Sequence, residues 1–298
     1  MIKISICTCT RNRQKGLKNL LESLNNLKAP PNANIKIIVI ENNFKNLSED
    51  IVKAFASTSR FNTRYFLETR QGLAYARNRS VRESIGSDFC CFVDDDQIVA
   101  SDWLFELVKC QREFDADGIW GPNPPIFSNI VPSYIRQFHT LKLFDYGTIV
   151  TYASTNCLLL RKEYLDKING PFDIRLNYSG GEDIYLAYLI SKLGGIIRFN
   201  PNAIAYEIIP NDRTTIKYIV RRSFRNANTD YFVKYLINEN FNKIKIFLKL
   251  VLRLGFGLLI VIPFLLFGKS NSLKGLIKIS NAVGGFSFLM GRKNQFYR

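Results

Sequence analysis

Cys90-Cys91-Phe92-Val93-Asp94-Asp95-Asp96-Gln97 is the stretch that decides the fold. The apolar run 89–93 is typical of a strand that is buried on both faces of a parallel sheet. Three adjacent carboxylates follow, and because they repel one another they need solvent, a basic partner or a divalent cation. Mg²⁺ and Mn²⁺ prefer oxygen ligands, and open α/β sheets bind ligands beyond the carboxyl ends of their strands. The stretch therefore indicates either a cation site at a sheet edge or a solvated acidic turn.

Strand-like and helix-like segments alternate around this stretch. Apolar and β-branched residues predict strands over 2–8, 35–40, 64–67, 89–93, 118–121, 154–160, 196–199 and 203–207. Helical spacing and capping residues, among them Ser48, predict helices over 12–27, 48–56, 72–85, from 102, over 161–165 and over 184–192. A proline-rich stretch, 122–132, predicts an irregular excursion. This alternation predicts an α/β fold with a Rossmann-like, doubly wound and largely parallel sheet.

The positive charge of the chain is concentrated near its end. The net charge is +16, of which residues 211–298 carry +13 and the first 210 residues only +3. A nearly neutral body with a basic and apolar tail is typical of proteins on anionic membrane surfaces. No basic stripe with interleaved aromatic residues accompanies the charge, so we expect no nucleic-acid partner.

The tail itself predicts helices that associate with a membrane. A basic helix is predicted over 216–236, and it is followed by the uncharged runs 254–268 and 279–291. A helix of 15 residues spans about 22 Å, short of the ~30 Å hydrocarbon core of a bilayer. The runs therefore indicate interfacial amphipathic helices, a re-entrant hairpin or a soluble helical subdomain. We expect a catalytic domain over 1–215 and a membrane-associating region over 216–298.

The start of the chain and its cysteines indicate the cytoplasm. The first residues, Met1-Ile2-Lys3-Ile4-Ser5-Ile6, lack the long apolar stretch of a secretory signal. Four of the six cysteines fall in predicted core strands, and none has metal-ligand spacing with the lone His139. We expect buried, reduced thiols.

Two further motifs carry polar groups toward the same sheet edge. Arg70-Gln71-Gly72-Leu73-Ala74-Tyr75-Ala76-Arg77-Asn78 opens a helix just before the acidic strand, and its backbone donors with Arg77 predict an anion site. Gly180-Gly181-Glu182-Asp183 places two acids at a helix start after a flexible turn. These acids suit either a general base in a cleft or the stabilisation of a helix dipole.

Five segments, in chain order, resemble those of the family 2 inverting glycosyltransferases of the GT-A fold. They are Ser5–Arg13 (first strand), Val39–Asn43 (second strand), Gly72–Asn78, the DxD-like Asp94–Asp96 and the ED-like Gly181–Asp183. Glu207–Arg213 and Arg221–Arg225 further resemble segments of bacterial cell-surface polysaccharide and lipid-linked glycosyltransferases. The resemblance covers residues 2 to about 230. Two departures stand out: Glu41 is one methylene longer than the usual Asp, and Cys9 replaces a proline.

The resemblance implies a role for each matched acidic residue. Asp96 would ligate Mn²⁺ or Mg²⁺ bridging the donor diphosphate, and Asp94 would accept hydrogen bonds from the ribose or the donor sugar. Asp95, between them, would help to bind the donor, mainly through a structural role. Asp183 would deprotonate the acceptor hydroxyl, and Glu182 would shape the acceptor pocket.

The remaining matched residues would bind the nucleotide part of the donor. Glu41 would bond the base, and Arg77 would position sugar or phosphate. The nucleotide edge would be lined by Thr8, Thr10 and Arg13.

The implied protein is a metal-dependent inverting glycosyltransferase at the cytoplasmic face of the membrane. It would move a sugar from a nucleotide-sugar donor, expected to be a UDP-sugar, to a hydroxyl of a lipid-linked or growing surface saccharide. One alternative is a sugar-phosphate nucleotidyltransferase, which needs a glycine-rich basic signature that residues 8–13 lack. Another is a non-catalytic membrane-associated scaffold with a degenerate site, against which the retention of Asp96 and Asp183 counts.

Overall fold

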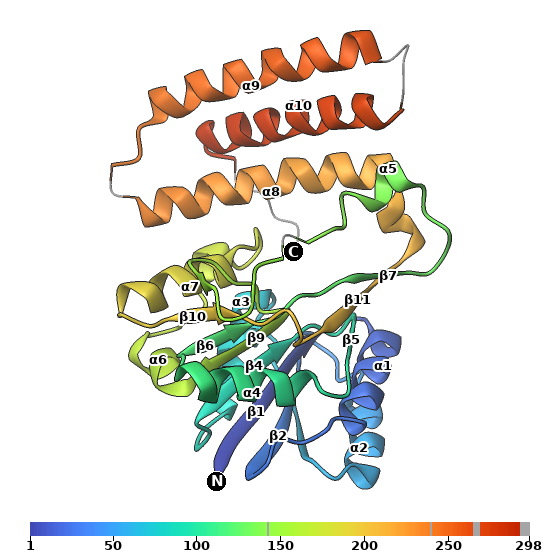
Figure 1. The fold of residues 1–298 in the computed structure, drawn as a ribbon, viewed down its shortest axis with the longest axis vertical. Helices are drawn as coiled ribbons and strands as arrows, with labels where there is room; N and C mark the ends of the chain where they lie inside the picture. Colours follow the sequence, from blue (N-terminus) through green and yellow to red (C-terminus); the bar gives the residue numbers. More distant parts are fainter. Residues whose placement is uncertain (142, 239, 265–268, 293–298) are drawn as a thin grey trace. The chain divides into compact units, whose positions relative to one another are not determined.

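An eight-stranded sheet forms the centre of the first of two units into which the chain divides (Figure 1). This sheet unit comprises Met1–Ile126, Leu141–Asn177 and Glu182–Ile208, and the helical unit comprises Phe127–Thr140, Tyr178–Gly181 and Ile209–Arg298. The structure is a computed structural model that describes residues 1–141, 143–238, 240–264 and 269–292. The helical unit thus takes two segments from before residue 216, where the sequence placed the domain boundary.

The sheet is mixed, with parallel pairs in the majority. Its strand order is β3-β2-β1-β4-β9-β6-β10-β8. The strands are β1 (Ile2–Thr10), β2 (Ala33–Glu41), β3 (Asn62–Leu67), β4 (Phe89–Val93), β6 (Gly118–Trp120), β8 (Ile149–Val150), β9 (Cys157–Arg161) and β10 (Ile197–Phe199). The pairs β1–β2, β2–β3, β1–β4 and β6–β10 are parallel, while β9 runs antiparallel to both β4 and β6, and β8 antiparallel to β10. The expected α/β fold with a largely parallel sheet is confirmed.

Alternation along the strands buries both faces of the sheet. In β2, Ile37 and Val39 pack into one core while Ile38 and Ile40 pack into the other. The first core is closed by α1 (Gln14–Asn25), α2 (Glu49–Thr58) and α4 (Trp103–Phe114), and the second by α3 (Leu73–Glu83), α6 (Lys162–Lys167) and α7 (Glu182–Lys192). Because successive side chains of a strand point to opposite faces, a continuous apolar strand requires this three-layer arrangement.

Short elements complete the sheet unit. The strand β5 (Gln97–Val99) pairs antiparallel with β11 (Ala205–Ile209), and the 3₁₀ helix η1 (Ile174–Leu176) precedes α7. The strand β7 (Pro125–Phe127) lies within the stretch expected to be irregular. Trp103 is fully buried, as a core residue should be, and its Nε1 donates to Cys157 Sγ at 3.1 Å. All six cysteines are free thiols, as expected.

The helical unit is built from three long helices. These are α8 (Ile216–Ile237), α9 (Lys243–Phe264) and α10 (Lys269–Leu289), preceded by α5 (Ser133–Arg136) and the 3₁₀ helix η2 (Asn211–Thr214). Within this unit α10 packs against both α8 and α9 (Figure 1). The approach of α10 to α8 is close at Gly284, where a methyl group would lie 2.2 Å from the Phe224 carbonyl oxygen.

The two uncharged runs of the tail fall largely in α9 and α10. Residues 265–268, at the end of the first run, lie outside the described residues. Among the helices that the structure describes, none combines the length and the apolar character that crossing a membrane requires.

Candidate active site

The sheet topology gathers the predicted residues at one edge. β1, β2 and β4 are parallel, so the segments that follow Thr10, Glu41 and Val93 leave the sheet at the same end. β9 is antiparallel and pairs Cys157 with Val93, so its beginning reaches this end as well. We call this end of the sheet, with residues 94–96 and the start of α7, the acidic edge.

The turn that carries the three aspartates is held by buried neighbours. Gln97 is 1% exposed; its Oε1 accepts from the Asp94 amide at 2.9 Å and its Nε2 donates to the Ala205 carbonyl at 3.3 Å. On the α1 side, a Cβ at Gly16 would lie 2.5 Å from the Asp95 carbonyl oxygen. A glycine is therefore needed for α1 to approach the turn so closely. This packing fixes the backbone of the turn that carries the three carboxylates.

Arg13 neutralises part of the acidic edge. Its Nη1 donates to Asp95 Oδ1 at 2.9 Å and to Asp96 Oδ2 at 3.0 Å. Burial alone would lower the pKa of Arg13, but the two carboxylates raise it above its ordinary value. Burial raises the pKa of Asp95 to about 6 even though the adjacent guanidinium opposes the shift. Asp95 is 3% exposed, which suits the structural role expected of it.

Arg77 joins the acidic turn to α7. Its Nη2 donates to Asp94 Oδ1 at 3.2 Å, and its Nη1 donates to Glu182 Oε1. Glu182 is 1% exposed, and its second oxygen, Oε2, is buried and has no hydrogen-bond partner among the residues that the structure describes. Burial raises the pKa of Glu182 to about 7 against the opposing charge of Arg77. Glu182 thus exchanges a proton near neutral pH. The expected contact of Arg77 with sugar or phosphate stays a prediction.

The amino end of α3 is not available as an anion site. Asn177, just after η1, accepts from the Ala74 amide at 3.0 Å and the Tyr75 amide at 3.4 Å through its Oδ1. Its Nδ2 donates to the Gln71 carbonyl at 2.9 Å. The prediction that these backbone donors bind an anion is wrong, because a side chain distant in the sequence already satisfies them.

Asp183 is held by neutral donors. Ser154 Oγ donates to its Oδ2 at 2.9 Å, the Thr155 amide lies 3.4 Å from the same oxygen, and the Ile184 amide donates to Oδ1 at 2.8 Å. Within the described residues Asp183 takes part in no salt bridge, and its residue is partly exposed. These contacts orient the carboxylate while leaving its charge uncompensated by a bonded cation.

Glu41 is enclosed at the end of β2. It is fully buried, and its carboxylate accepts from the Ser48 amide at 2.8 Å, the Ser48 hydroxyl at 3.2 Å and the Tyr65 hydroxyl at 2.7 Å. Ser48 precedes α2, but its side chain bonds Glu41 instead of capping the helix as expected. The base contact predicted for Glu41 is untested, and a base would have to share this carboxylate with two protein side chains.

Thr8 and Thr10 lie on the last part of β1, and both are buried. Among the described residues, neither the Thr8 hydroxyl nor the Thr10 hydroxyl has a direct hydrogen-bond partner. The Thr10 hydroxyl acts on Asp95, whose pKa it lowers against the effect of burial. The Thr10 side chain therefore lies beside the acidic turn, and the nucleotide contacts predicted for both threonines stay predictions.

The acidic edge fits a divalent cation that is shared with a ligand. Five carboxylates (Asp94, Asp95, Asp96, Glu182 and Asp183) meet two bonded guanidiniums, those of Arg13 and Arg77. The Asp94 and Asp96 side chains keep 40% and 22% of their surface exposed. In the part of the chain that the structure describes, no three acidic, His or Cys side chains form a metal cage. Mg²⁺ is commonly held by one or two carboxylates plus substrate phosphates, and these two exposed aspartates suit that mode.

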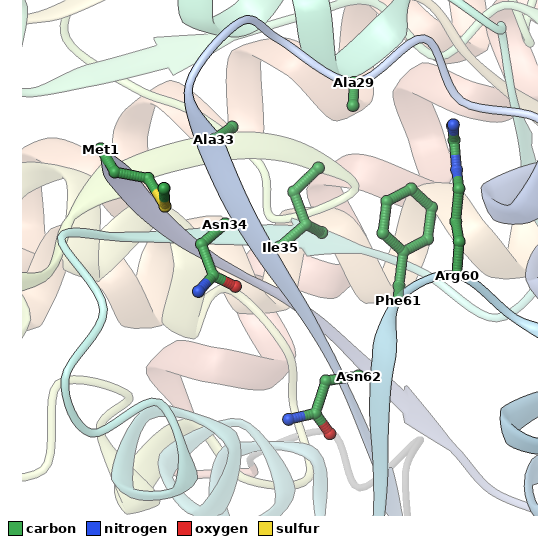
Figure 2. A pocket seen from close by; sticks show the side chains of 8 residues that line it. All are labelled: Met1, Ala29, Ala33, Asn34, Ile35, Arg60, Phe61 and Asn62. Carbon is green, nitrogen blue, oxygen red and sulfur yellow. The ribbon is translucent and has the colours of Figure 1, made fainter.

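A cavity at the opposite end of the sheet does not share this chemistry. It has a volume of about 380 Å³ and is lined by Met1, Ala29, Ala33, Asn34, Ile35, Arg60, Phe61 and Asn62 (Figure 2). Its one charged side chain is that of Arg60, which donates a hydrogen bond to the Leu27 carbonyl. The guanidinium carbon of Arg60 lies 4.7 Å from the centre of the Phe61 ring. The cavity therefore offers no carboxylate and lies where β2 and β3 begin, away from the acidic edge.

Sequence reasoning missed the residues that orient the others. The sequence predicts Ser154 and Thr155 to lie in a strand, but this strand begins at Cys157 in the structure. It predicts no orienting role for Gln97 or Asn177. The signal available for Gln97 was its position directly after three acids. For Asn177, whose partners lie more than 100 residues earlier, no local pattern exists.

Comparisons with known proteins agree with this architecture. Residues 5–168 match the family described as "Glycosyl transferase family 2". The chain is 30% identical over 231 residues to the succinoglycan biosynthesis protein ExoM of Rhizobium meliloti (strain 1021), covering 76% of this chain and 73% of that protein.

Solved structures share the fold at low sequence identity. The mannosyltransferase PcManGT from Pyrobaculum calidifontis, in complex with GDP-Man and Mn²⁺, superposes with a TM-score of 0.69 at 14% identity, over 97% of this chain and 88% of that one. TarS from S. aureus, in complex with UDP, gives a TM-score of 0.55 at 15% identity, over 97% and 92% of the two chains. The expected GT-A-like fold is confirmed, and the nucleotidyltransferase and scaffold alternatives gain no support. The chain belongs to glycosyl transferase family 2 and is a glycosyltransferase.

Proposed function

We propose that this glycosyltransferase moves a sugar, with inversion and with the help of a divalent cation, from a nucleotide-diphosphate sugar to a hydroxyl of a saccharide acceptor. One observation carries the proposal: the two ends of the acidic edge are held in different ways. Asp95 and Asp96 are bonded to Arg13, whereas the donors to Asp183 within the described residues are all neutral. A carboxylate that is oriented but not ion-paired suits proton abstraction, and an exposed acidic turn suits a cation.

The transfer step would be a single displacement. The acceptor oxygen forms a bond to the anomeric carbon while the bond from that carbon to the diphosphate oxygen breaks. The proton of the acceptor hydroxyl passes to Asp183, whose Oδ2 is oriented by the Ser154 hydroxyl. Glu182, bonded to Arg77 directly beside this base, would border the acceptor. Because its pKa lies near 7, its charge would change across the physiological range.

The donor would be held at the other end of the acidic edge. Asp96, with Asp94 beside it, would hold Mn²⁺ or Mg²⁺ together with the diphosphate, and Arg13 lies within reach of the same charges. When bound, the cation would offset the negative charge that develops on the leaving diphosphate. Thr8, Thr10 and Glu41 would lie beside the nucleotide. Glu41 would contact the base while it accepts hydrogen bonds from Ser48 and Tyr65.

The ligands bound in the neighbouring structures support a nucleotide-sugar donor. PcManGT was solved with GDP-Man and Mn²⁺, and TarS with UDP and with UDP-GlcNAc. We propose a UDP-sugar for this chain. The name of ExoM associates it with succinoglycan biosynthesis, which supports a lipid-linked or growing surface saccharide as the acceptor here. With such an acceptor, the enzyme would work at the cytoplasmic face of the membrane.

A panel of nucleotide sugars tests the proposal. Thermal unfolding would be followed with each UDP-, GDP- and dTDP-sugar, with Mn²⁺ or with EDTA, and the stabilising donor would then be used in transfer assays. We expect a cation-dependent rise in Tm with a UDP-sugar and a product whose anomeric configuration, read by NMR, is opposite to that of the donor. Retention of configuration, or equal binding in EDTA, would contradict the proposed chemistry.

A further inference from the structure

The outer face of α9 is apolar, which is the reverse of an ordinary surface helix. Six large side chains recur there at helical spacing, with exposed fractions between 45% and 75%: Ile244 (74%), Leu248 (58%), Val251 (46%), Leu252 (75%), Leu258 (46%) and Leu259 (70%). Monomeric soluble proteins rarely expose a contiguous apolar surface of this kind unless it binds something.

The opposite side of the same helix packs inside the helical unit. Leu250 is fully buried, and Gly257 approaches Gly275 and Ile279 of α10 so closely that a methyl group would lie 2.8 Å from the Ile279 side chain. α10 therefore fixes the rotation of α9 about its axis. The apolar face is turned outward by packing and is not the result of a loosely placed helix.

A row of cations runs along one side of the outer face. Lys245, Lys249 and Arg253 are spaced by four residues and are all exposed, so they form a stripe parallel to the helix axis. α9 contains no acidic residue, and the last 88 residues of the chain carry a net charge of +13. A partner of this surface must therefore be apolar where it meets the six large side chains and anionic beside them.

We propose that α9 lies flat on an anionic lipid bilayer, with its outer face in the boundary between headgroups and acyl chains. The 22 residues of α9 give a helix about 33 Å long, and its exposed apolar side chains extend from Ile244 to Leu259. Lys245, Lys249 and Arg253 then lie at the level of the lipid phosphates, as expected for amphipathic helices at an interface. The proposal deepens the proposed function, because a lipid-linked acceptor would be met at this surface.

Vesicle flotation of the full-length chain tests the apolar contact. The wild type is expected to float with vesicles of phosphatidylcholine and phosphatidylglycerol and to bind pure phosphatidylcholine at least tenfold more weakly. The double variant Leu248→Gln/Leu252→Gln should lose at least tenfold in partitioning, because two large side chains no longer favour the acyl boundary. Its matched control is Ile85→Gln/Ile130→Gln, which changes two residues with exposed fractions of 81% and 98% outside α9 and should bind like the wild type.

A second set of variants tests the cation stripe. Replacing Lys245, Lys249 and Arg253 by Gln should weaken binding to the anionic vesicles about a hundredfold at low salt, with a smaller loss at high salt because the attraction is screened. The control replaces the same number of exposed lysines on helices of the sheet unit, Lys18, Lys53 and Lys109. Equal losses in both sets would overturn the assignment to α9.

Two other outcomes would overturn the proposal. One is unchanged flotation of the Leu248/Leu252 variant. The other is a concentration-dependent dimer of the wild type, seen by light scattering and abolished in this variant, which would show that a second copy covers the face. Donor binding is measured on the same proteins: variants that bind the donor but not vesicles support the inference, and failure of donor binding in the wild type contradicts the proposed function alone.

Discussion

The acidic edge and the outer face of α9 handle charge in opposite ways. At the acidic edge, five carboxylates and two guanidiniums share a partly buried space. Most of the carboxylate oxygens accept a hydrogen bond from a protein donor. Along α9, three cations stand exposed beside apolar side chains. Chemistry on a reacting bond needs fixed atoms, whereas attachment to a fluid surface needs only a pattern of residues.

This difference predicts how the two regions respond to mutation. A single atom removed from the acidic edge should matter, because orientation and protonation are set by individual hydrogen bonds. On α9 a single substitution should matter little, because six apolar and three basic side chains share the contact. The predictions below use this contrast, from the largest expected effect to the smallest.

The largest effect is expected for Asp183→Asn. The amide keeps the shape and can still accept from Ser154, but it cannot take the acceptor proton. Transfer should fall about 10²- to 10⁴-fold, the range typical for loss of a general base. Initial rates with saturating donor would measure it, with Asp50→Asn, on the exposed side of α2, as the control. Vesicle binding should be unchanged, and near-normal transfer would assign the base to another residue.

An intermediate effect is expected for Ser154→Ala. This change removes the 2.9 Å hydrogen bond to Asp183 Oδ2 but leaves the carboxylate in place. A hydrogen bond to a charged group contributes about 1.5–3 kcal/mol, so kcat should fall at least about tenfold with little change in the KM for the donor.

Two further variants show whether Ser154 acts through its hydroxyl. Ser154→Thr keeps a hydroxyl and should recover most of the rate, while Ser57→Ala, on the exposed surface of α2, should have no effect. An equal loss in the Ala and Thr variants would indicate that the position matters for packing and not for orienting Asp183.

The smallest effect is a change of stability with pH for Glu182→Gln. The pKa of Glu182 is raised to about 7 in the folded state from an ordinary 4.5, so the folded protein binds the proton more tightly than the unfolded chain does. The tighter binding of this proton stabilises the folded protein fully below pH 4.5, and the stabilisation is lost as the pH rises through 7. Relative to the Gln variant, the wild type should lose up to about 1.4 kcal/mol of unfolding free energy per pH unit in this window.

Urea unfolding at pH 5, 6, 7 and 8 measures this difference. The pKa of Asp95 is raised to about 6, so Asp95 also makes the unfolding free energy depend on pH. This contribution is similar in the two proteins and cancels when their unfolding free energies are subtracted. A constant difference between wild type and Glu182→Gln across the range would show that Glu182 is ionised throughout.

The parts of the fold that depend on local pattern could be predicted from the sequence. The continuous apolar run before Asp94, the helical spacing of the leucines in α1 and the basic stretch of α8 are local patterns that predict these elements. The exposed face of α9 was only partly predictable. Its amphipathic character follows from the sequence, but which side is turned outward depends on the close contact with α10.

The arrangement of the candidate site could be predicted only where it follows from parallel strands. Thr10, Glu41 and Asp94 meet because the carboxyl ends of β1, β2 and β4 share an edge. Ser154 and Thr155 could not be placed, because an apolar strand sequence does not reveal that β9 is antiparallel and enters at that edge. The capping of α3 by Asn177 could not be predicted either, because its partners lie more than 100 residues earlier in the sequence, and this side chain holds amides that the sequence predicts to bind an anion.

Calorimetric titration of the nucleotide sugar into Asp96→Asn and Asp183→Asn, with Mn²⁺ and with EDTA, tests most directly whether the acidic edge divides its work between a donor end and a base end. Asp96 bonds Arg13, while Asp183 bonds Ser154, so the two substitutions disturb separate contacts. We expect the Mn²⁺-dependent part of binding to disappear in Asp96→Asn and to persist in Asp183→Asn, whose transfer is lost. Mn²⁺-dependent binding that survives in Asp96→Asn, or that vanishes in both variants, would contradict this account.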